Sequence, residues 1–114
     1  PHGRRRHPGA PDMSALARLA ATIAARKGAD PDSSWTAKLL ANPDNAAEKF
    51  GEEAVEAIIE AVKDDKAKLT SEAADALYHL LVMCAARGVT LADIEAELAA
   101  RQHQSGIAEK AARG

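Results

Sequence analysis

The chain has 114 residues, of which 28% are charged, and a formal net charge of −2 at pH 7. This length suits one domain, the near-neutral charge provides no basic field for nucleic acid, and no apolar run is long enough to span a membrane. We therefore expect one soluble, cytoplasmic domain with no secretory leader that binds neither nucleic acid nor a membrane.

Alanine dominates the apolar content, with 28 residues, whereas aromatic residues make up only 3% of the chain. Large core side chains are therefore scarce. Long Ala-rich helices are more stable when two chains bury their apolar faces together, so we expect a homo-oligomer, with a dimer as the simplest form. The single Cys84 lies in an apolar run and reads as a small core residue.

Residues 1–12 are rich in Pro and Gly and carry a basic triplet, which predicts a disordered extension before the domain. A basic arm for an acidic partner is the alternative. We place an all-α domain at residues 13–105 and a frayed tail at residues 106–114. Its first helix begins after Ser14 and ends at Lys27, followed by Gly28.

A short second helix carries Trp35 and Leu39, is capped by Ser33 or Ser34, and ends before Pro43. We predict that Trp35 is a core anchor. The alternative is that this ring, which lies beside Ser and Thr hydroxyls, stacks on a base.

The third helix is predicted from Asn45 to Val62, with Asp44 as its cap. Gly51 lies in its interior, where Gly costs about 1 kcal/mol relative to Ala, and this predicts that another backbone or a ligand approaches there. The charged residues 64–68 form a short connection, so the third and fourth helices should be antiparallel neighbours.

The fourth helix is apolar on almost every side from Leu69 to Met83 and stops at Gly88, which predicts a buried central helix. Thr90 and Asp93 have the spacing of a capping box for a fifth helix, whose inner face would carry Leu91, Ile94 and Leu98. No strand pattern is found, so the predicted fold class is all-α.

Two acidic patterns lie in the third and fourth helices. Glu53 and Glu56 share one helical stripe with Lys49 and Glu60, while Glu72, Asp75 and His79 share a face of the fourth helix. An acidic stripe is usually a solvated face, but Glu72 and Asp75 interrupt an apolar helix. If the two faces meet, carboxylates ~6 Å apart repel by roughly 3 kcal/mol per pair at an effective dielectric constant near 20, so a cation is needed.

The candidate ligands are carboxylate oxygens without Cys, which favours Mg²⁺, or alternatively Mn²⁺, over Zn²⁺. Mg²⁺ typically binds through carboxylates together with substrate phosphates. The sequence has no Gly-rich phosphate loop, so the metal would hold most of the phosphate charge. These residues therefore point to phosphate-ester or phosphoanhydride chemistry on a nucleotide.

The pattern Glu52-Glu53-x-x-Glu56, fifteen further residues, then Glu72-x-x-Asp75 resembles the metal motif of the all-α, MazG-like nucleoside triphosphate pyrophosphohydrolases. The flanking strings SWTAKLL (34–40), EKFGEE (48–53) and ADALYHLLV (74–82) resemble the phosphoribosyl-ATP pyrophosphohydrolase family of histidine biosynthesis. The resemblance covers residues 16–101. It implies a MazG-like bundle of about five helices that is completed by homo-oligomerisation.

The resemblance also implies Mg²⁺-dependent cleavage between the α- and β-phosphates of phosphoribosyl-ATP, giving phosphoribosyl-AMP and pyrophosphate. By position, the metal ligands would be Glu53, Glu56, Glu72 and Asp75. Glu52 joins Glu53 as a catalytic candidate, either as general base or as a hydrogen-bonding neighbour of the ligands; a solvated Glu52 is the alternative.

Positive charge is needed where pyrophosphate leaves. Lys49 and Arg101 rank first, although Lys49 also suits an i,i+4 ion pair with Glu53, worth only ~0.3–0.5 kcal/mol. His79 is a substrate-binding candidate, with a satisfied core histidine as the alternative. The full substrate-binding set is Arg26, Lys27, Lys38, Lys49, His79 and Arg101.

Two other functions remain open at this point. A housecleaning enzyme that hydrolyses ordinary or damaged nucleoside triphosphates would use the same acidic motif, and only the strings around Trp35 and Tyr78 favour the biosynthetic enzyme. A non-catalytic helical dimerisation module would carry the acidic face incidentally. Stabilisation by millimolar Mg²⁺ would argue against such a module.

Overall fold

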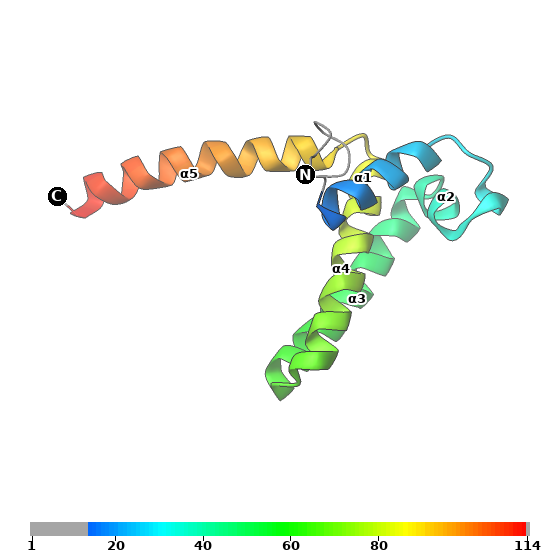
Figure 1. Ribbon diagram of the computed structural model, residues 1–114, viewed down its shortest axis with the longest axis horizontal. Helices are drawn as coiled ribbons and strands as arrows, with labels where there is room; N and C mark the ends of the chain where they lie inside the picture. The colour runs from blue at the N-terminus through cyan, green and yellow to red at the C-terminus, as the bar shows by residue number, and fades with distance from the viewer. Residues whose placement is uncertain (1–13, 114) are drawn as a thin grey trace, which may run out of the picture.

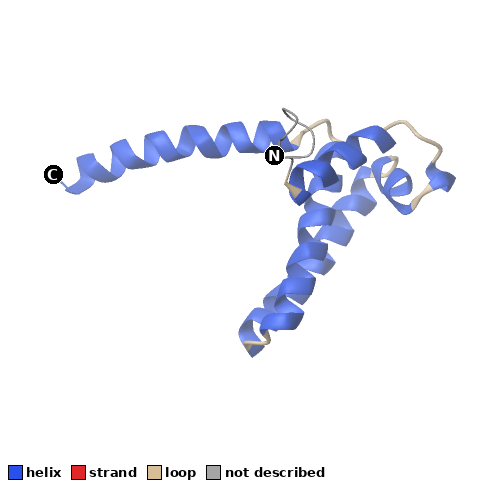
Figure 2. Ribbon diagram, viewed as in Figure 1, coloured by secondary structure: helices blue, strands red, loops and turns tan. Residues whose placement is uncertain are grey.

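The computed structural model describes residues 14–113, and side chains from 14 to 102. The predicted extension at residues 1–12 lies outside these residues. The elements are α1 (Ala15–Arg26), the 3₁₀ turn η1 (Pro31–Ser33), α2 (Trp35–Leu40), α3 (Pro43–Lys63), α4 (Lys66–Ala86) and α5 (Leu91–Arg113). The described chain contains helices and no strand, so the all-α prediction is confirmed (Figure 2).

Helices α3 and α4 form a long antiparallel hairpin, and α1 and α2 pack across the end of it that holds the start of α3 and the end of α4 (Figure 1). The core lies at this end and consists of Ile23, Leu39, Leu40, Ala46, Leu81 and Val82. Helix α5 leaves the body at 103° to α4. The opposite end of the hairpin therefore has no covering helix in the described chain.

Side-chain caps fix the helix starts. The Ser14 hydroxyl accepts from Ala17 N at 3.1 Å, as predicted, and Ser34 caps α2. The prediction that Asp44 caps α3 is wrong. The side chain of Asn42 accepts from the backbone N–H of Asn45 at 3.2 Å and so caps the helix. Pro43 then occupies the first helical position, where its missing N–H has no cost, so the helix begins one residue earlier than Asp44.

The turn between α3 and α4 is tighter than the predicted connection over residues 64–68. Only Asp64 and Asp65 separate the helices. Asp64 adopts a left-handed conformation with φ of 59°, which Asp tolerates better than most residues, and Asp65 caps α4 by accepting from Lys68 N at 3.0 Å. This two-residue turn, followed directly by the Asp65 cap, sets the register of the hairpin.

The prediction that α4 is buried on almost every side is wrong for the single chain. Its fully buried residues are His79, Leu81 and Val82, whereas Leu77 is exposed. Trp35, predicted as a core anchor, is also exposed. Leu77 lies on a side of α4 that the other described helices leave exposed, whereas Trp35 belongs to α2 itself and shares the exposed side of that short helix with Lys38.

A Cβ added at Gly51 would meet nothing within 4 Å, so no backbone of the described chain approaches this glycine, and approach of a ligand there stays a prediction. The predicted inner position of Leu98 is wrong. Leu98 is exposed because α5 leaves the body after Leu91 and Ile94, which alone among its predicted inner residues pack on the core. Cys84 is half-buried.

Helix α5 continues as helical backbone past residue 105 to Arg113, so the predicted domain end does not coincide with a helix end. Fraying of residues 106–114 stays a prediction. Among the described residues, no single helix has the length and apolar character to cross a membrane; the bent pair of α4 and residues 91–102 satisfies that test by length and composition only.

The capping box of α5 provides a test of local stability. Asp93 Oδ2 accepts from Thr90 N at 2.9 Å, and Thr90 Oγ1 accepts from Asp93 N at 3.0 Å. The hydrogen bond from the Thr90 backbone, and then that from its hydroxyl, lower the pKa of Asp93. This carboxylate therefore stabilises the fold above the ordinary pKa of Asp, and the stabilisation is lost as pH falls through the lowered pKa.

We expect Asp93→Ala to lower the melting temperature at pH 7, and its difference from wild type to vanish on acidification, as measured by circular dichroism. Glu95→Ala is the control, because it removes an exposed negative charge from the same turn without touching the box. Equal losses in the two variants would show that helix-dipole charge, and not the capping box, is responsible.

Candidate functional site

The two acidic patterns meet across the α3–α4 hairpin. Glu53 and Glu56 lie one turn apart on α3, and Glu72 faces them from α4. One carboxylate oxygen from each of the three lies within 4.8 Å of the others. We call these three residues the acidic trio. Three of the four predicted metal ligands are thus brought together by one turn and one helix register.

Glu72 is the electrostatically strained member of the trio. Desolvation, followed by the charge and hydrogen bond of Glu56 and then the charges of Asp75 and Glu53, raises the pKa of Glu72. Its Oε1 atom is buried and has no hydrogen-bond partner among the described residues. A buried carboxylate oxygen next to other carboxylates is poorly satisfied without a cation.

The trio fits a hard divalent cation. It offers oxygen ligands only, its charges repel one another, and its side chains range from half-buried to exposed, which leaves room for water and phosphate oxygens. Mg²⁺ is usually bound in this way, by a few carboxylates with its remaining positions filled by water or substrate. The trio therefore supplies three of the four oxygen ligands that the sequence predicted.

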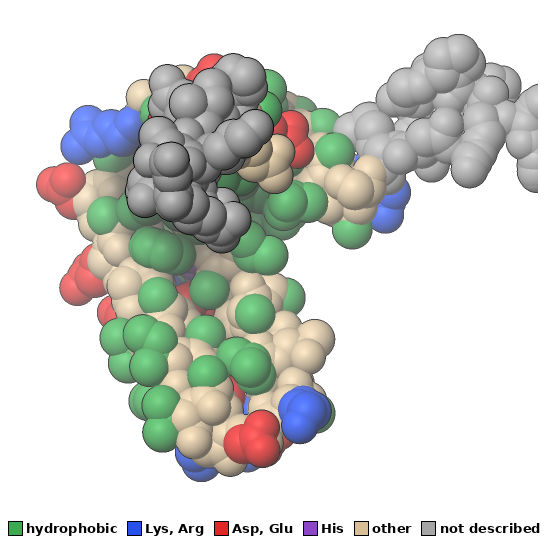
Figure 3. Space-filling model, turned by 90° about the vertical axis from the view of Figure 1, so that its left-hand side faces the viewer, with side chains coloured by type: hydrophobic (Ala, Val, Ile, Leu, Met, Phe, Trp, Pro, Cys, Tyr) green, Lys and Arg blue, Asp and Glu red, His purple; other side chains and the backbone are tan. Residues whose placement is uncertain are grey.

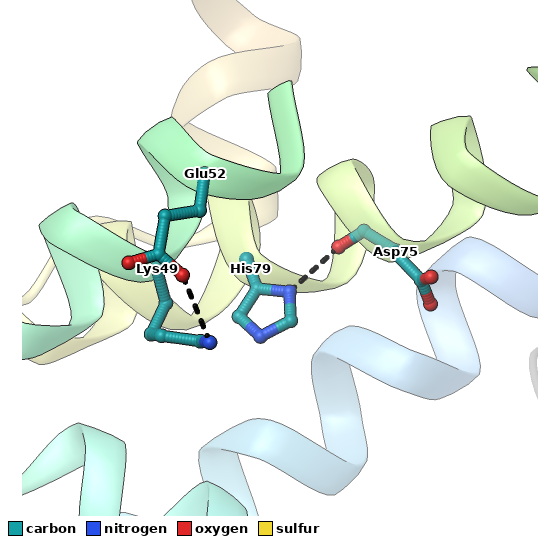
Figure 4. Close-up of polar contacts among 4 residues, drawn as sticks. All are labelled: Lys49, Glu52, Asp75 and His79. Atoms are coloured by element: carbon teal, nitrogen blue, oxygen red, sulfur yellow. Dashed lines mark hydrogen bonds and ion pairs between the residues drawn. The ribbon is translucent and has the colours of Figure 1, made fainter. Parts of the chain in front are cut away.

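Asp75 lies outside the trio. It is exposed, and Figure 4 shows its carboxylate directed away from the ring of His79. Its charge still contributes to the raised pKa of Glu72, so it lies near enough to act on that group. Its role as fourth ligand stays a prediction.

The spacing of the sequence suggested an ion pair between Lys49 and Glu53, but in the structure Lys49 pairs with Glu52. Its Nζ donates to Glu52 Oε1 at 3.1 Å, an i,i+3 pair. The hydrogen bond and charge of Glu52 raise the pKa of Lys49, and the charges of Glu53 and Glu56 add to the effect. A charged ammonium group therefore lies beside the acidic trio, while the predicted catalytic role of Glu52 stays untested.

His79 is buried, with 8% of its surface exposed. Its Nδ1 lies 2.8 Å from the backbone oxygen of Asp75, and because a carbonyl only accepts, Nδ1 carries the proton. Figure 4 draws the imidazole between the Lys49–Glu52 pair and this carbonyl. Its Nε2 is buried without a partner in the described chain, so the alternative of a satisfied core histidine holds for one ring nitrogen only.

Three of the other predicted cations, Lys27, Arg26 and Arg101, lie away from the trio. Lys27 donates to the carbonyl oxygen of Ala85 and so caps the last turn of α4, roughly 20 Å along the helix from Glu72. Arg26 precedes Lys27 at the same end of α1. Arg101 pairs with Glu97 at 3.0 Å on α5, which points away from the hairpin (Figure 1). In the single chain, none of these three reaches the acidic trio.

Sequence reasoning passed over two features. Glu60 lies one turn beyond Glu56 and has a buried Oε1 without a partner among the described residues; its place on the stripe from Lys49 was the available signal. The second feature is a hydrogen bond of 2.5 Å between Thr36 Oγ1 and Tyr78 OH, which joins α2 to α4. No spacing rule predicts such a contact between distant segments.

A family model described as phosphoribosyl-ATP pyrophosphohydrolase matches residues 16–102, which include the whole acidic trio and Asp75. The chain belongs to the phosphoribosyl-ATP pyrophosphohydrolase family. The resemblance that was based on three short strings and the acidic motif is therefore confirmed.

Relatives named phosphoribosyl-ATP pyrophosphatase support the same assignment. The protein from Dinoroseobacter shibae is 78% identical over 102 residues, covering 89% of this chain and 100% of its own length. That from Cereibacter sphaeroides is 75% identical, covering 90% of this chain and 100% of its own. The Ruegeria pomeroyi protein is 76% identical, with coverage of 89% and 97%.

The charge repulsion in the trio makes Glu72→Gln informative. Because the pKa of Glu72 is raised, its ionised form opposes folding at neutral pH, and this effect disappears as pH falls below the ordinary pKa of Glu. We expect Glu72→Gln, without metal, to melt at or above the wild-type temperature at pH 7. The gap should close on acidification.

In the same melting experiment, millimolar Mg²⁺ should stabilise the wild type and leave Glu72→Gln unchanged. Glu48→Gln, an exposed substitution on α3, is the matched control and should respond to Mg²⁺ like the wild type. A clear loss of stability in metal-free Glu72→Gln would instead identify Glu72 as a structural hydrogen-bonding residue.

Proposed function

We propose that this chain hydrolyses the α–β phosphoanhydride of phosphoribosyl-ATP, giving phosphoribosyl-AMP and pyrophosphate, as a cytoplasmic step of histidine biosynthesis. Membership of the phosphoribosyl-ATP pyrophosphohydrolase family over residues 16–102 is the observation that carries the proposal. The acidic trio supports it, since a triphosphate needs a cation-binding site of oxygen ligands.

In this proposal Glu53, Glu56 and Glu72 bind Mg²⁺, or alternatively Mn²⁺, with Asp75 as the fourth ligand. The bound cation supplies neutralisation of phosphate charge and lowers the pKa of a water molecule. Glu52 and Glu53 are the candidates to accept the proton of the attacking water. Lys49, whose ammonium is held charged beside them, neutralises the leaving pyrophosphate.

Substrate choice must be made away from the trio, because every nucleoside triphosphate presents the same phosphates to the metal. Phosphoribosyl-ATP differs from ATP by a second ribose phosphate on the adenine ring, which calls for a further cation. Lys38 and Arg26 were the sequence candidates. The hydrogen bond between Thr36 and Tyr78 ties the helix of Lys38 to α4 near Asp75. Arg26 precedes Lys27, which contacts Ala85 at the C-terminal end of α4, so the geometry favours Lys38.

Product analysis with phosphoribosyl-ATP tests the activity, and Lys38→Met tests the choice of substrate. We expect this variant to lose roughly ten- to a hundredfold in kcat/KM for phosphoribosyl-ATP, since a charged hydrogen bond contributes ~1.5–3 kcal/mol, and much less for any hydrolysis of ATP. Lys66→Met, at an exposed position near the hairpin turn, is the control.

Wild-type protein that hydrolyses ordinary nucleoside triphosphates as efficiently as phosphoribosyl-ATP would favour the housecleaning alternative. Equal losses on both substrates in Lys38→Met would place Lys38 at the shared triphosphate.

The active form in this proposal is a homodimer. Val55, Ile58, Ile59 and Val62 follow the i, i+3, i+4, i+7 pattern on α3 and are between 46% and 81% exposed. Figure 3 shows hydrophobic side chains gathered along the hairpin. A second copy would cover this stripe with the same stripe, as two-fold symmetry requires. Pairing would also supplement a core that is thin in one chain.

Sedimentation of the wild type at micromolar concentration should show a dimer and no folded monomer. Ile58→Glu puts a charge in the middle of the stripe and should shift the protein toward monomer with reduced helicity. Lys63→Glu, beside the stripe on α3, is the control for added negative charge. A well-folded wild-type monomer at these concentrations would rule out the proposed assembly.

A further inference from the structure

Trp35 is the only tryptophan in the chain, and its side chain is exposed and not part of the core. It is 48% exposed, although it begins a short helix whose Ala37, Leu39 and Leu40 are buried. The exposed side chains of α2 are those of Trp35 and Lys38. Three positions apart on a helix, these two residues fall on the same side. One face of α2 thus anchors the helix, and the other presents a ring and a cation.

The helix that carries Trp35 is held at a fixed place. Ser34 caps it by accepting from Ala37 N at 3.0 Å, and Leu39 is fully buried in the core. The part-buried hydrogen bond of 2.5 Å between Thr36 Oγ1 and Tyr78 OH then joins the residue after Trp35 to α4. An exposed ring on an element with these three attachments is a preorganised contact and not a loose surface side chain.

The attachment point lies close to the acidic residues of α4. Tyr78 follows Asp75 by three residues and Glu72 by six, which corresponds to roughly 4.5 and 9 Å along the helix axis. Thr36, which contacts Tyr78, is the direct neighbour of Trp35. The start of α2, which carries Trp35, therefore lies beside the part of α4 that also holds Asp75 and, two turns back, Glu72.

An adenine base stacks favourably on an aromatic side chain, and the chain has three aromatic residues of Phe, Tyr and Trp type. Tyr78 is already committed, because its hydroxyl bonds Thr36 and its ring packs edge-on against His79 with centroids 4.8 Å apart. Phe50 is half-buried on α3. Trp35 is the most exposed of the three, and it has the largest face.

We propose that Trp35 stacks on the adenine base of the substrate, with Lys38 one turn further along α2 beside the ribose phosphate that the base carries. This inference rests on the proposed hydrolysis of phosphoribosyl-ATP for the identity of the ligand. It assigns the base to α2 and the triphosphate to the α3–α4 hairpin, so the two ends of the nucleotide are bound by different elements. The hydrogen bond between Thr36 and Tyr78 sets the spacing between them.

Kinetics test the role of the ring. Trp35→Ala should raise KM for phosphoribosyl-ATP roughly tenfold to a hundredfold, since stacking on an aromatic side chain contributes on that scale, while kcat changes little. Trp35→Phe keeps a ring and should restore most of the affinity. Val89→Ala, an exposed apolar substitution outside α2, is the control, and melting curves of all three variants check folding. An unchanged KM in folded Trp35→Ala overturns the proposal.

The single indole also reports binding directly, in wild-type protein with Mg²⁺ present. Phosphoribosyl-AMP and AMP should quench its fluorescence with saturation, whereas pyrophosphate and ribose 5-phosphate, which lack the base, should not. Equal quenching by pyrophosphate would overturn the proposal, and so would an emission spectrum that shifts only with dissociation of the dimer, because Trp35 would then be a subunit contact.

This readout separates the two hypotheses. If the wild type fails to hydrolyse phosphoribosyl-ATP, the proposed function fails, but saturable quenching by AMP would still place adenine on Trp35. If hydrolysis is observed without quenching by AMP or phosphoribosyl-AMP, the function stands and the stacking role is excluded.

Discussion

The convergence of Glu53, Glu56 and Glu72 is the constraint on which the rest of the structure depends. Three carboxylates whose oxygens lie within 4.8 Å repel one another, and the hairpin must hold them together before any cation arrives. The interactions that hold the hairpin lie at its two ends. The left-handed Asp64 and the Asp65 cap fix the register at the turn, while α1 and α2 clamp the opposite end through the apolar core. The acidic residues lie between these two fixed points.

Local chemistry made most of the helices predictable. Ser14, Gly28 and the Thr90–Asp93 pair act on backbone groups within a few residues, so a short window of sequence contains the whole interaction. The cap of α3 was predicted wrongly as Asp44, because Asn42 and Asp44 lie on either side of Pro43 and both are residue types that cap helices. The meeting of the three carboxylates could be predicted, because helical spacing placed the acidic residues of each helix on one face and the short connection between α3 and α4 made the two helices neighbours.

Burial and pairing could not be predicted in the same way. Whether Trp35 or Leu77 is covered depends on which side of its helix the neighbouring helices pack against, and no periodicity within a helix contains that information. Lys49 had Glu52 and Glu53 within reach, and side-chain conformation rather than spacing decided between them. Arg101 was assigned to the substrate by its place in the sequence alone, but the direction of α5 is set after Gly88 by the turn, with φ of 81° at that glycine.

The two-residue turn between α3 and α4 also places the acidic trio within one uninterrupted stretch of chain, from residue 53 to residue 72. Contacts between such near neighbours form early, because little chain entropy is lost in closing so short a loop. The charged centre is therefore built from one segment of the chain, and none of its three carboxylates comes from the C-terminal helix.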